Sequence, residues 1–171
     1  MNRILIVFVL LLGTSRVFSQ PSSLSEMPMK TLGNESVKLS DYLGKGPVYI
    51  TFWALWCEPC KTELRYLQKI HEKYSADGLT ILAINHDTQK SLAKVQPYIA
   101  AKGYTFTVII DPDFEIFQKL NGEQLPYSLL FDPKGIVVTR RTGFLPGDER
   151  DIEKEIKEVL EKVSKSEKAH E

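Results

Sequence analysis

The chain has 171 residues, enough to bury the core of one domain, and 43% of them are hydrophobic while 26% are charged. Basic and acidic residues number 22 each, so the formal net charge is zero. Without a basic surplus to bind phosphates, a nucleic-acid-binding role has no electrostatic support.

The N-terminus has the pattern of a secretory signal. Arg3 supplies a positive charge, Ile4–Leu12 is an unbroken apolar run, and Val17 and Ser19 stand where a cleavage site places small residues. The run is too short to cross a bilayer comfortably, which favours a cleaved signal peptide and leaves an uncleaved signal anchor as the alternative. We therefore expect an extracytoplasmic protein, in a periplasm, that is soluble or N-terminally anchored.

A short hairpin is expected before the main sheet. Met29–Leu39 alternates weakly between apolar and polar residues, and Gly33-Asn34 is a turn signal. We divide the chain into four segments: a signal at 1–19, a lead-in at 20–35, a folded domain at 36–165 and a polar tail at 166–171.

Strands and helices alternate through the domain. Strands are predicted from β-branched and aromatic runs, and helices from the spacing of leucines and isoleucines and from the glycines that end them. The expected order is strand Val48–Ala54, a helix from the cysteines to about Gly78, strand Leu79–Ile84, helix Thr88–Ala101, strand Phe106–Ile110 and short helix Phe114–Leu120. A β-hairpin of Tyr127–Phe131 and Ile136–Thr142 follows around the type I turn Asp132-Pro133-Lys134-Gly135, and a helix begins at Asp148 and gives way to a polar tail from Ser164. The pattern predicts a three-layer α/β fold with a mixed sheet, parallel in its core and antiparallel at the hairpin.

Cys57 and Cys60 are the only cysteines, and they are spaced as Cys-x-x-Cys between a strand and a helix. A bridge across so small a loop removes little unfolded-chain entropy, so a structural role is disfavoured and a redox role is favoured. Cys57 is expected at the helix N-terminus, where unpaired N–H groups favour a thiolate nucleophile, with Cys60 one turn deeper as the resolving thiol. Pro59 suits the first helical turn.

The carboxylate of Glu58 should oppose the helix dipole at Cys57. The dipole favours the thiolate by about 0.3–2 kcal/mol, whereas a carboxylate about 7 Å away costs it about 1 kcal/mol at an effective dielectric of roughly 40. We therefore expect a Cys57 thiol that is only moderately acidified, in a pair that prefers to act as a reductant.

Together these features resemble the thioredoxin superfamily. The motif Trp-x-x-Trp-Cys-Glu-Pro-Cys-Lys-x-Glu, the helix after the second strand and the hairpin are most similar to the ResA/TlpA-type extracytoplasmic thiol-disulfide oxidoreductases. The resemblance covers about residues 36–163 and implies a thioredoxin-like three-layer sandwich with an inserted helix.

The resemblance also implies roles for further residues. Pro126 falls at the family's cis-proline, and the backbone of Leu125 would pair with an extended substrate segment. Glu63 would receive the proton of Cys60, and Trp56 would cap the site beside Cys57. Trp56, Glu58, Pro59, Leu125 and Pro126 are thus the candidate substrate-binding residues, and Cys57, Cys60 and Glu63 the candidate catalytic ones.

Two positions depart from the family pattern. Thr51 stands where thioredoxin has a buried acid, which leaves Glu63 as the better proton acceptor. Arg65 replaces a helix-kinking proline, so the first helix should be straighter. Gly143, after the last strand, is expected to permit close backbone approach near the site.

The implied partners are extracytoplasmic proteins that carry disulfides, with apocytochrome c as one destination, and a membrane electron donor that restores the dithiol. No cofactor beyond the disulfide is implied. The alternatives are a thiol peroxidase, which wants a threonine where the chain has Ala54, and a copper-binding module, which usually spaces its cysteines by three residues. No metal site is expected, since only His71, His86 and His170 accompany the two cysteines.

Overall fold

The structure is a computed structural model that describes residues 24–168. The expected signal at 1–19 and His170 lie outside that range. Its elements in chain order are η1 (Leu24–Glu26), β1 (Pro28–Thr31), β2 (Ser36–Lys38), η2 (Leu39–Asp41), β3 (Val48–Trp53), α1 (Glu58–Tyr74), β4 (Thr80–Asn85), α2 (Gln89–Leu92), α3 (Val95–Lys102), β5 (Thr107–Ile110), α4 (Glu115–Lys119), β6 (Tyr127–Phe131), β7 (Val137–Thr142) and α5 (Asp148–Lys168).

The strands of the described residues form one seven-stranded sheet in the order β2-β1-β5-β4-β3-β6-β7. The three central strands β3, β4 and β5 run parallel, whereas the N-terminal hairpin and the β6–β7 hairpin pair antiparallel at the two edges. This confirms the mixed α/β sheet and the N-terminal hairpin. The turn of that hairpin uses Asn34 in the left-handed region, with φ of 67°, beside Gly33.

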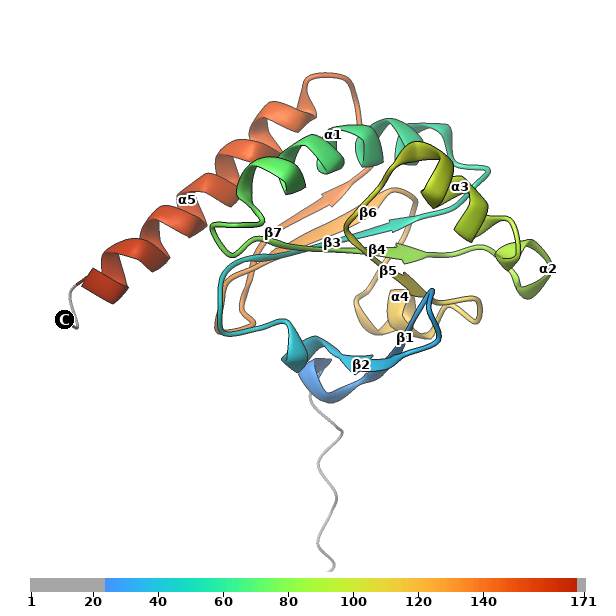
Figure 1. Ribbon diagram of the computed structural model, residues 1–171, viewed down its shortest axis with the longest axis horizontal. Helices are drawn as coiled ribbons and strands as arrows, with labels where there is room; N and C mark the ends of the chain where they lie inside the picture. The colour runs from blue at the N-terminus through green and yellow to red at the C-terminus, as the bar shows by residue number, and fades with distance from the viewer. Residues whose placement is uncertain (1–23, 169–171) are drawn as a thin grey trace, which may run out of the picture.

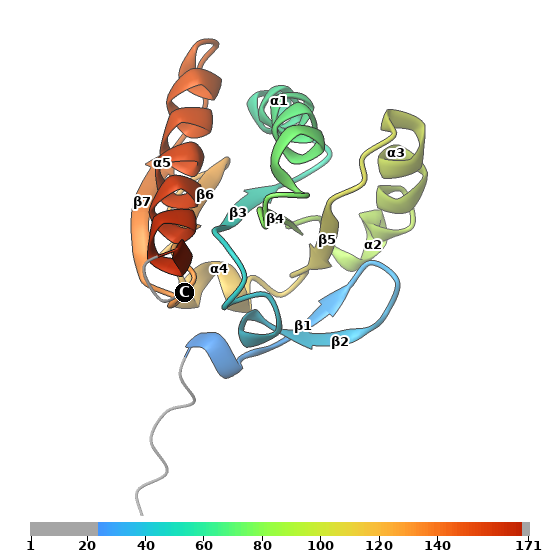
Figure 2. The same ribbon diagram turned by 60° about the vertical axis from the view of Figure 1, so that its left-hand side comes forward.

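Helices cover the sheet from both sides. Figures 1 and 2 both place α1, α3 and α5 over one face and α4 on the other, while the β1–β2 hairpin continues the sheet beyond β5. Two buried clusters fill the spaces between these layers, one under α1 and α5 and one toward α4 and the hairpin. The expected three-layer sandwich is therefore confirmed.

Three boundaries differ from those expected from sequence. The helix expected over 88–101 is two helices, α2 and α3, because the chain turns between Leu92 and Val95. β1 lies in the segment expected as lead-in, and it pairs with β5, so the sheet begins at Pro28. α5 continues to Lys168, where Ser164 and Ser166 donate hydrogen bonds to the helix backbone one turn earlier.

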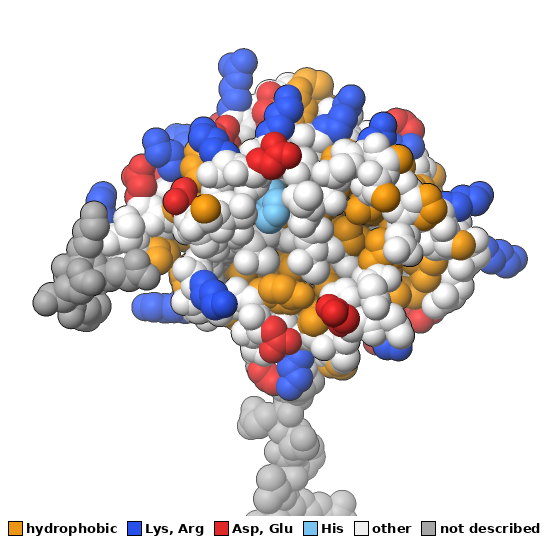
Figure 3. Space-filling model, in the orientation of Figure 1, with side chains coloured by type: hydrophobic (Ala, Val, Ile, Leu, Met, Phe, Trp, Pro, Cys, Tyr) orange, Lys and Arg blue, Asp and Glu red, His pale blue; other side chains and the backbone are white. Residues whose placement is uncertain are grey.

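The surface carries charges of both signs. Figure 3 shows Lys and Arg side chains interspersed with Asp and Glu along the margin formed by the helices. Ion pairs join some of these residues, including Lys154 with Glu158 at 4.0 Å and Lys157 with Glu161 at 3.7 Å on α5. On the face that Figure 3 shows, charges of both signs are therefore mixed along the helices.

Candidate redox site

The two cysteines lie at the start of α1. Cys57 is the residue that caps the helix, in an extended conformation with φ of −90° and ψ of 98°, and its sulfur accepts the backbone N–H of Cys60 at 3.3 Å. Pro59 sits in the first turn, where a missing N–H leaves no hydrogen bond unmade. The helix N-terminus therefore directs a donor at the Cys57 sulfur, as the sequence predicted.

Cys57 and Cys60 are joined by a disulfide, with their Cα atoms 5.3 Å apart. Both are shielded, since 4% of Cys57 and none of Cys60 is exposed. Cys57 is the more accessible sulfur and Cys60 lies deeper against the sheet, which is the expected division between an attacking and a resolving cysteine.

The loop before Cys57 is fixed by the neighbouring strand end. The buried carboxylate of Asp87, just beyond β4, accepts the N–H of Leu55 at 2.8 Å and the side-chain N–H of Asn85 at 2.9 Å. One residue earlier, the N–H of His86 donates to the carbonyl of Trp53 at 2.8 Å. These bonds attach the loop to β4, so β4 as well as β3 positions the cysteines.

Glu63 is buried one helical turn beyond Cys60, with 1% of its surface exposed. The hydroxyl of Thr51 donates to Oε2 at 2.7 Å, and the hydroxyl of Tyr49 lies 3.1 Å from Oε1. Burial raises the pKa of Glu63 to about 7, against the opposing effect of these hydrogen bonds and of the Arg141 charge. A side chain that could have been an ordinary exposed glutamate is instead a buried carboxyl that titrates near neutral pH.

Leu125 and Pro126, where the sequence predicts a docking edge, immediately precede β6. The Leu125–Pro126 peptide bond is cis, as the resemblance implied. The carbonyl of Pro126 accepts the N–H of Gly143 at 2.8 Å, and Gly143 has a left-handed φ of 82° that favours glycine. Because Phe52 pairs with Tyr127, the end of β3 and the start of β6 meet at the same edge of the sheet. The cysteine loop, the cis-proline and the β7–α5 loop are therefore brought together.

Two large apolar side chains are exposed at this edge. Trp56 precedes Cys57 and is 69% exposed, and Leu145 follows Gly143 and is 71% exposed. Sequence reasoning identified Trp56 and missed Leu145, because a single leucine in a loop has no pattern that marks it as exposed. Together they give the site an apolar rim.

Glu58 does not act alone on Cys57. Its side chain is largely exposed, and Oε1 lies 2.8 Å from the Nζ of Lys61. The nearby cation offsets part of the carboxylate field that the sequence argument assigned to Glu58, and exposure to water screens both charges.

Among residues 24–168, the side chains of His71 and His86 pack against aromatic rings. His86 is buried against the rings of Phe114 and Phe117, and burial lowers its pKa to about 4. His71 lies on α1 against Phe106. Within residues 24–168 no group of three or more His, Cys, Asp or Glu is arranged to hold a metal ion, and no helix of that range is long and apolar enough to cross a membrane.

Comparison with known proteins gives a consistent picture. A model of the AhpC/TSA family matches residues 22–140. The thiol-disulfide oxidoreductase ResA of Bacillus subtilis is 32% identical over 149 residues, which cover 82% of each protein. ResA of Geobacillus kaustophilus is 31% identical and covers 81% of this chain and 76% of its own length.

Solved structures agree with the fold. A Chlorobium tepidum protein assigned as the thiol:disulfide interchange protein DsbE superposes with a TM-score of 0.72 at 30% identity, covering 78% of this chain and 92% of that one. StoA from Bacillus subtilis, at 23% identity and a TM-score of 0.63, covers 79% of this chain and 98% of its own and shares the fold.

Proposed function

This chain belongs to the AhpC/TSA family of thioredoxin-fold proteins and is a thiol-disulfide oxidoreductase, and from that premise we propose that it reduces protein disulfides outside the cytoplasm. The observation that carries the mechanism is Glu63. A buried carboxyl with a pKa of about 7, one turn from Cys60, can accept a proton at the pH at which the enzyme works.

In the first step the Cys57 thiolate attacks one sulfur of the client disulfide. The N–H of Cys60 lies 3.3 Å from the Cys57 sulfur and stabilises its negative charge. A bond forms between Cys57 and the client, and the client's other sulfur leaves as a thiolate. The client segment pairs with the backbone of Leu125, and Trp56 and Pro126 border it.

In the second step Cys60 attacks the sulfur of Cys57. Its proton passes to Glu63, the Cys57–Cys60 bond forms, and the bond between Cys57 and the client breaks with its electron pair on the client sulfur. The client leaves reduced, and the enzyme holds the disulfide seen in the structure. No separate cofactor takes part, because the two sulfurs carry both electrons.

Continued turnover needs an outside source of electrons. We assign residues 1–19 to a secretory signal, cleaved or kept as an anchor, and an oxidising compartment would keep the pair closed. A membrane electron donor would restore the dithiol. Among clients, apocytochrome c is the candidate, so the enzyme would serve cytochrome c maturation.

The competing activity is a thiol peroxidase. Ala54 offers no hydroxyl to bind a peroxide three residues before Cys57, and its carbonyl instead accepts the N–H of Cys57 at 3.0 Å. The reductase is therefore the function that we carry forward.

The role of Glu63 is tested by separating the two steps. Reduced protein mixed with the aromatic disulfide dithionitrobenzoate releases one coloured thiolate when Cys57 attacks and a second when Cys60 resolves the adduct. In Glu63→Gln we expect an unchanged first phase and a second phase about 100-fold slower at neutral pH.

The wild-type second phase should rise with pH through a midpoint near 7, where Glu63 ionises, and the variant should lack this rise. Glu72→Gln, which changes an exposed glutamate on the same helix, is the matched control and should behave as wild type. A second phase in Glu63→Gln that keeps the wild-type rate and pH dependence would refute the proton transfer.

A further inference from the structure

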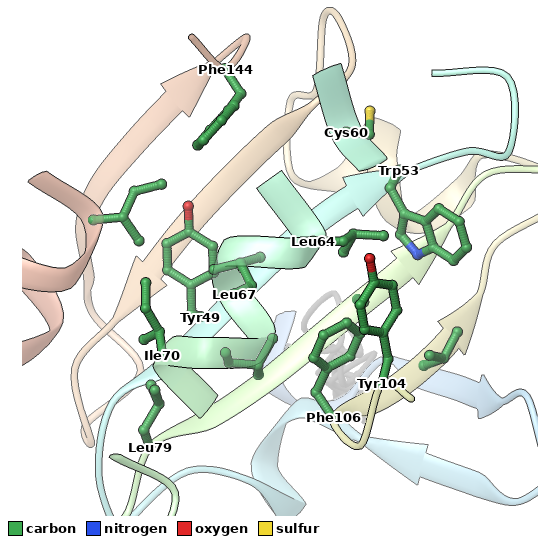
Figure 4. Close-up of a cluster of buried hydrophobic side chains, with 14 of the residues drawn as sticks. Tyr49, Trp53, Cys60, Leu64, Leu67, Ile70, Leu79, Tyr104, Phe106 and Phe144 are labelled. Atoms are coloured by element: carbon green, nitrogen blue, oxygen red, sulfur yellow. The ribbon is translucent and has the colours of Figure 1, made fainter. Parts of the chain in front are cut away.

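Tyr49 is a buried tyrosine at the centre of the sheet that the reaction scheme leaves without a role. It lies on β3 beneath α1, and Figure 4 shows its hydroxyl directed away from Ile70 and Leu79. Only 1% of the residue is exposed. Its hydroxyl lies 3.1 Å from Oε1 of Glu63 and 2.8 Å from Oγ of Ser128. Tyr49 therefore connects the carboxyl of Glu63 to a hydroxyl on a different strand.

The register of the sheet places Thr51, Ser128 and Arg141 side by side on neighbouring strands. Thr51 of β3 pairs with Ser128 of β6, and Ser128 pairs with Arg141 of β7. Because strand neighbours in register point to the same face, the hydroxyls of Thr51 and Ser128 project on the side that α1 covers. Ser128 is buried. The strand pairing therefore holds Ser128 in place. Because Ser128 is buried, water does not readily replace Tyr49 as its hydrogen-bond partner.

A phenol has one hydrogen and can both donate and accept. When Glu63 is ionised, Tyr49 donates to the carboxylate and accepts from Ser128. When Glu63 carries a proton, Glu63 donates to Tyr49, which turns its own hydrogen to Ser128. We propose, resting on the role of Glu63 given above, that Tyr49 and Ser128 form a reversible hydrogen-bond relay that keeps Glu63 fully bonded in both protonation states. They are positioning residues, and neither touches the sulfurs in this scheme.

The relay matters because Glu63 must change its protonation in every turnover. The resolving step moves one proton from Cys60 to Glu63 while the sulfur bonds exchange. A buried donor left without an acceptor carries the full cost of its lost hydration. With Ser128 present, the hydrogens of Glu63 and Tyr49 both have acceptors when Glu63 is neutral, and the unpaired hydrogen is moved to the serine, a weaker donor than a phenol.

Two charged residues also shift the pKa of Glu63, and the test substitutions do not alter them. Arg141 on β7 lowers the pKa of Glu63 and Asp148 at the start of α5 raises it. Arg141 is itself paired with Glu155 of α5 at 2.5 Å, and Asp151 lies close enough to act on Arg141. The substitutions that test the relay leave all of these residues unchanged.

The test is the titration of Glu63 itself in the oxidised protein, in which the cysteines cannot ionise. The pH-dependent chemical shift of its ¹³C-labelled side-chain carboxyl is measured by NMR and assigned by its loss in Glu63→Gln. Tyr49→Phe removes a hydrogen bond that is stronger to the ionised carboxylate than to the neutral carboxyl, so the midpoint should rise by about one pH unit.

Ser128→Ala should move the midpoint the other way, downward by up to about one pH unit. Without Ser128, protonated Glu63 must donate either to Tyr49 or to Thr51. Within the described residues Thr51 has no side-chain hydrogen bond other than that to Glu63, so the unpaired hydrogen falls on Tyr49 or Thr51, next to the carboxyl, instead of on Ser128. The neutral state of Glu63 is therefore disfavoured.

Tyr127→Phe is the matched control. Tyr127 is also buried on a sheet strand, but its hydroxyl donates to the carbonyl of Leu120 at 2.9 Å on the opposite side of the sheet. This variant should titrate as wild type. Opposite movement in Tyr49→Phe and Ser128→Ala supports the relay, whereas movement in the same direction, or none in either variant, overturns it.

The two-phase thiol assay then separates the relay from the proposed function. If the NMR midpoints move as expected and the pH dependence of the second phase follows them, both proposals are supported. If the midpoints move while the second phase keeps its wild-type pH dependence, the relay is supported and the role given to Glu63 in catalysis is overturned.

Discussion

Glu63 is the residue at which opposing effects meet. Burial favours its neutral form, whereas hydrogen bonds from Thr51 and Tyr49 and the charge of Arg141 favour its ionised form. The result is a pKa of about 7, close to the pH at which general acid–base catalysis is most effective. A fully exposed glutamate at this position would already be ionised at lower pH and would be a weaker base toward a thiol.

At the same scale, Asp87 should hold the cysteine loop. Replacing it by Ala leaves the partly buried N–H of Leu55 without its acceptor, so we expect Asp87→Ala to lower the free energy of unfolding by about 1–3 kcal/mol. Asp87→Asn keeps an acceptor oxygen and should be less affected. Chemical denaturation of the oxidised proteins measures both, and an Ala variant as stable as wild type would show that the bond contributes nothing.

How far individual residues could be predicted depends on the kind of signal they leave. Cys57 and Cys60 form a motif with fixed spacing, and they lie at the start of α1 as expected, whereas Pro126 was assigned from the resemblance, and its peptide bond is cis. Tyr49 and Ser128 are 79 residues apart and meet only through the pairing of β3 with β6. No local pattern encodes that register, because a buried tyrosine in an apolar strand looks like any other core residue.

Among the elements, those with strong periodicity were predicted best. β3 and α1, which hold the cysteines, begin and end close to the expected residues. The segment Thr88–Ala101 was expected as one helix and forms two, α2 and α3, since helix propensity continues across the position where the chain turns. The pairing of β1 with β5 could not be foreseen, because a strand as short as β1 leaves a weak alternation signal.

At the element scale, the loops at the edge of the sheet should recognise the client protein. Trp56→Ala and Leu145→Ala each remove an exposed apolar side chain of the rim, so we expect KM for a protein disulfide to rise about five- to tenfold. The rate with dithionitrobenzoate should stay within about twofold of wild type, because a small disulfide needs little of the rim.

Ile136→Ala provides the matched control for these two variants. Ile136 is 61% exposed but follows the β6–β7 turn, at the end of β7 opposite Gly143. Steady-state kinetics with a protein disulfide should leave this variant at the wild-type KM. Equal effects of all three substitutions would mean that the rim has no special part in docking.

For the whole molecule, burial of Glu63 predicts a pH dependence of stability. Unfolded, this carboxyl loses its proton near its ordinary value of 4.5, whereas folded it does so near 7, so the folded state binds more protons between these values. The free energy of unfolding of the oxidised protein should therefore fall as pH rises through this window, by up to roughly 3 kcal/mol.

Denaturation of wild type and Glu63→Gln at several pH values measures this contribution. Other carboxyls with lowered pKa values, such as Glu153, titrate in both proteins and cancel in the difference. We expect the stability of wild type to decline relative to the variant from about pH 4.5 to 7. A difference that stays constant over this range would show that Glu63 does not carry a raised pKa.

Across the whole chain, the fold presents one dithiol at an edge where three loops meet, with a titrating carboxyl behind it. In the mechanism that we propose, Cys57 forms a mixed disulfide and Cys60 resolves it. In the same proposal the apolar rim and the backbone of Leu125 bind the client protein, and Glu63 under α1 accepts the proton.

The most direct test of this account is to trap the mixed disulfide. Reduced Cys60→Ala protein is incubated with a disulfide-bearing protein, and the products are resolved without reductant and identified by mass spectrometry. We predict a stable adduct linked through Cys57, no adduct with Cys57→Ala, and only transient adduct with wild type. Absence of an adduct in Cys60→Ala, together with reductase activity that survives in Cys57→Ala, would contradict the account.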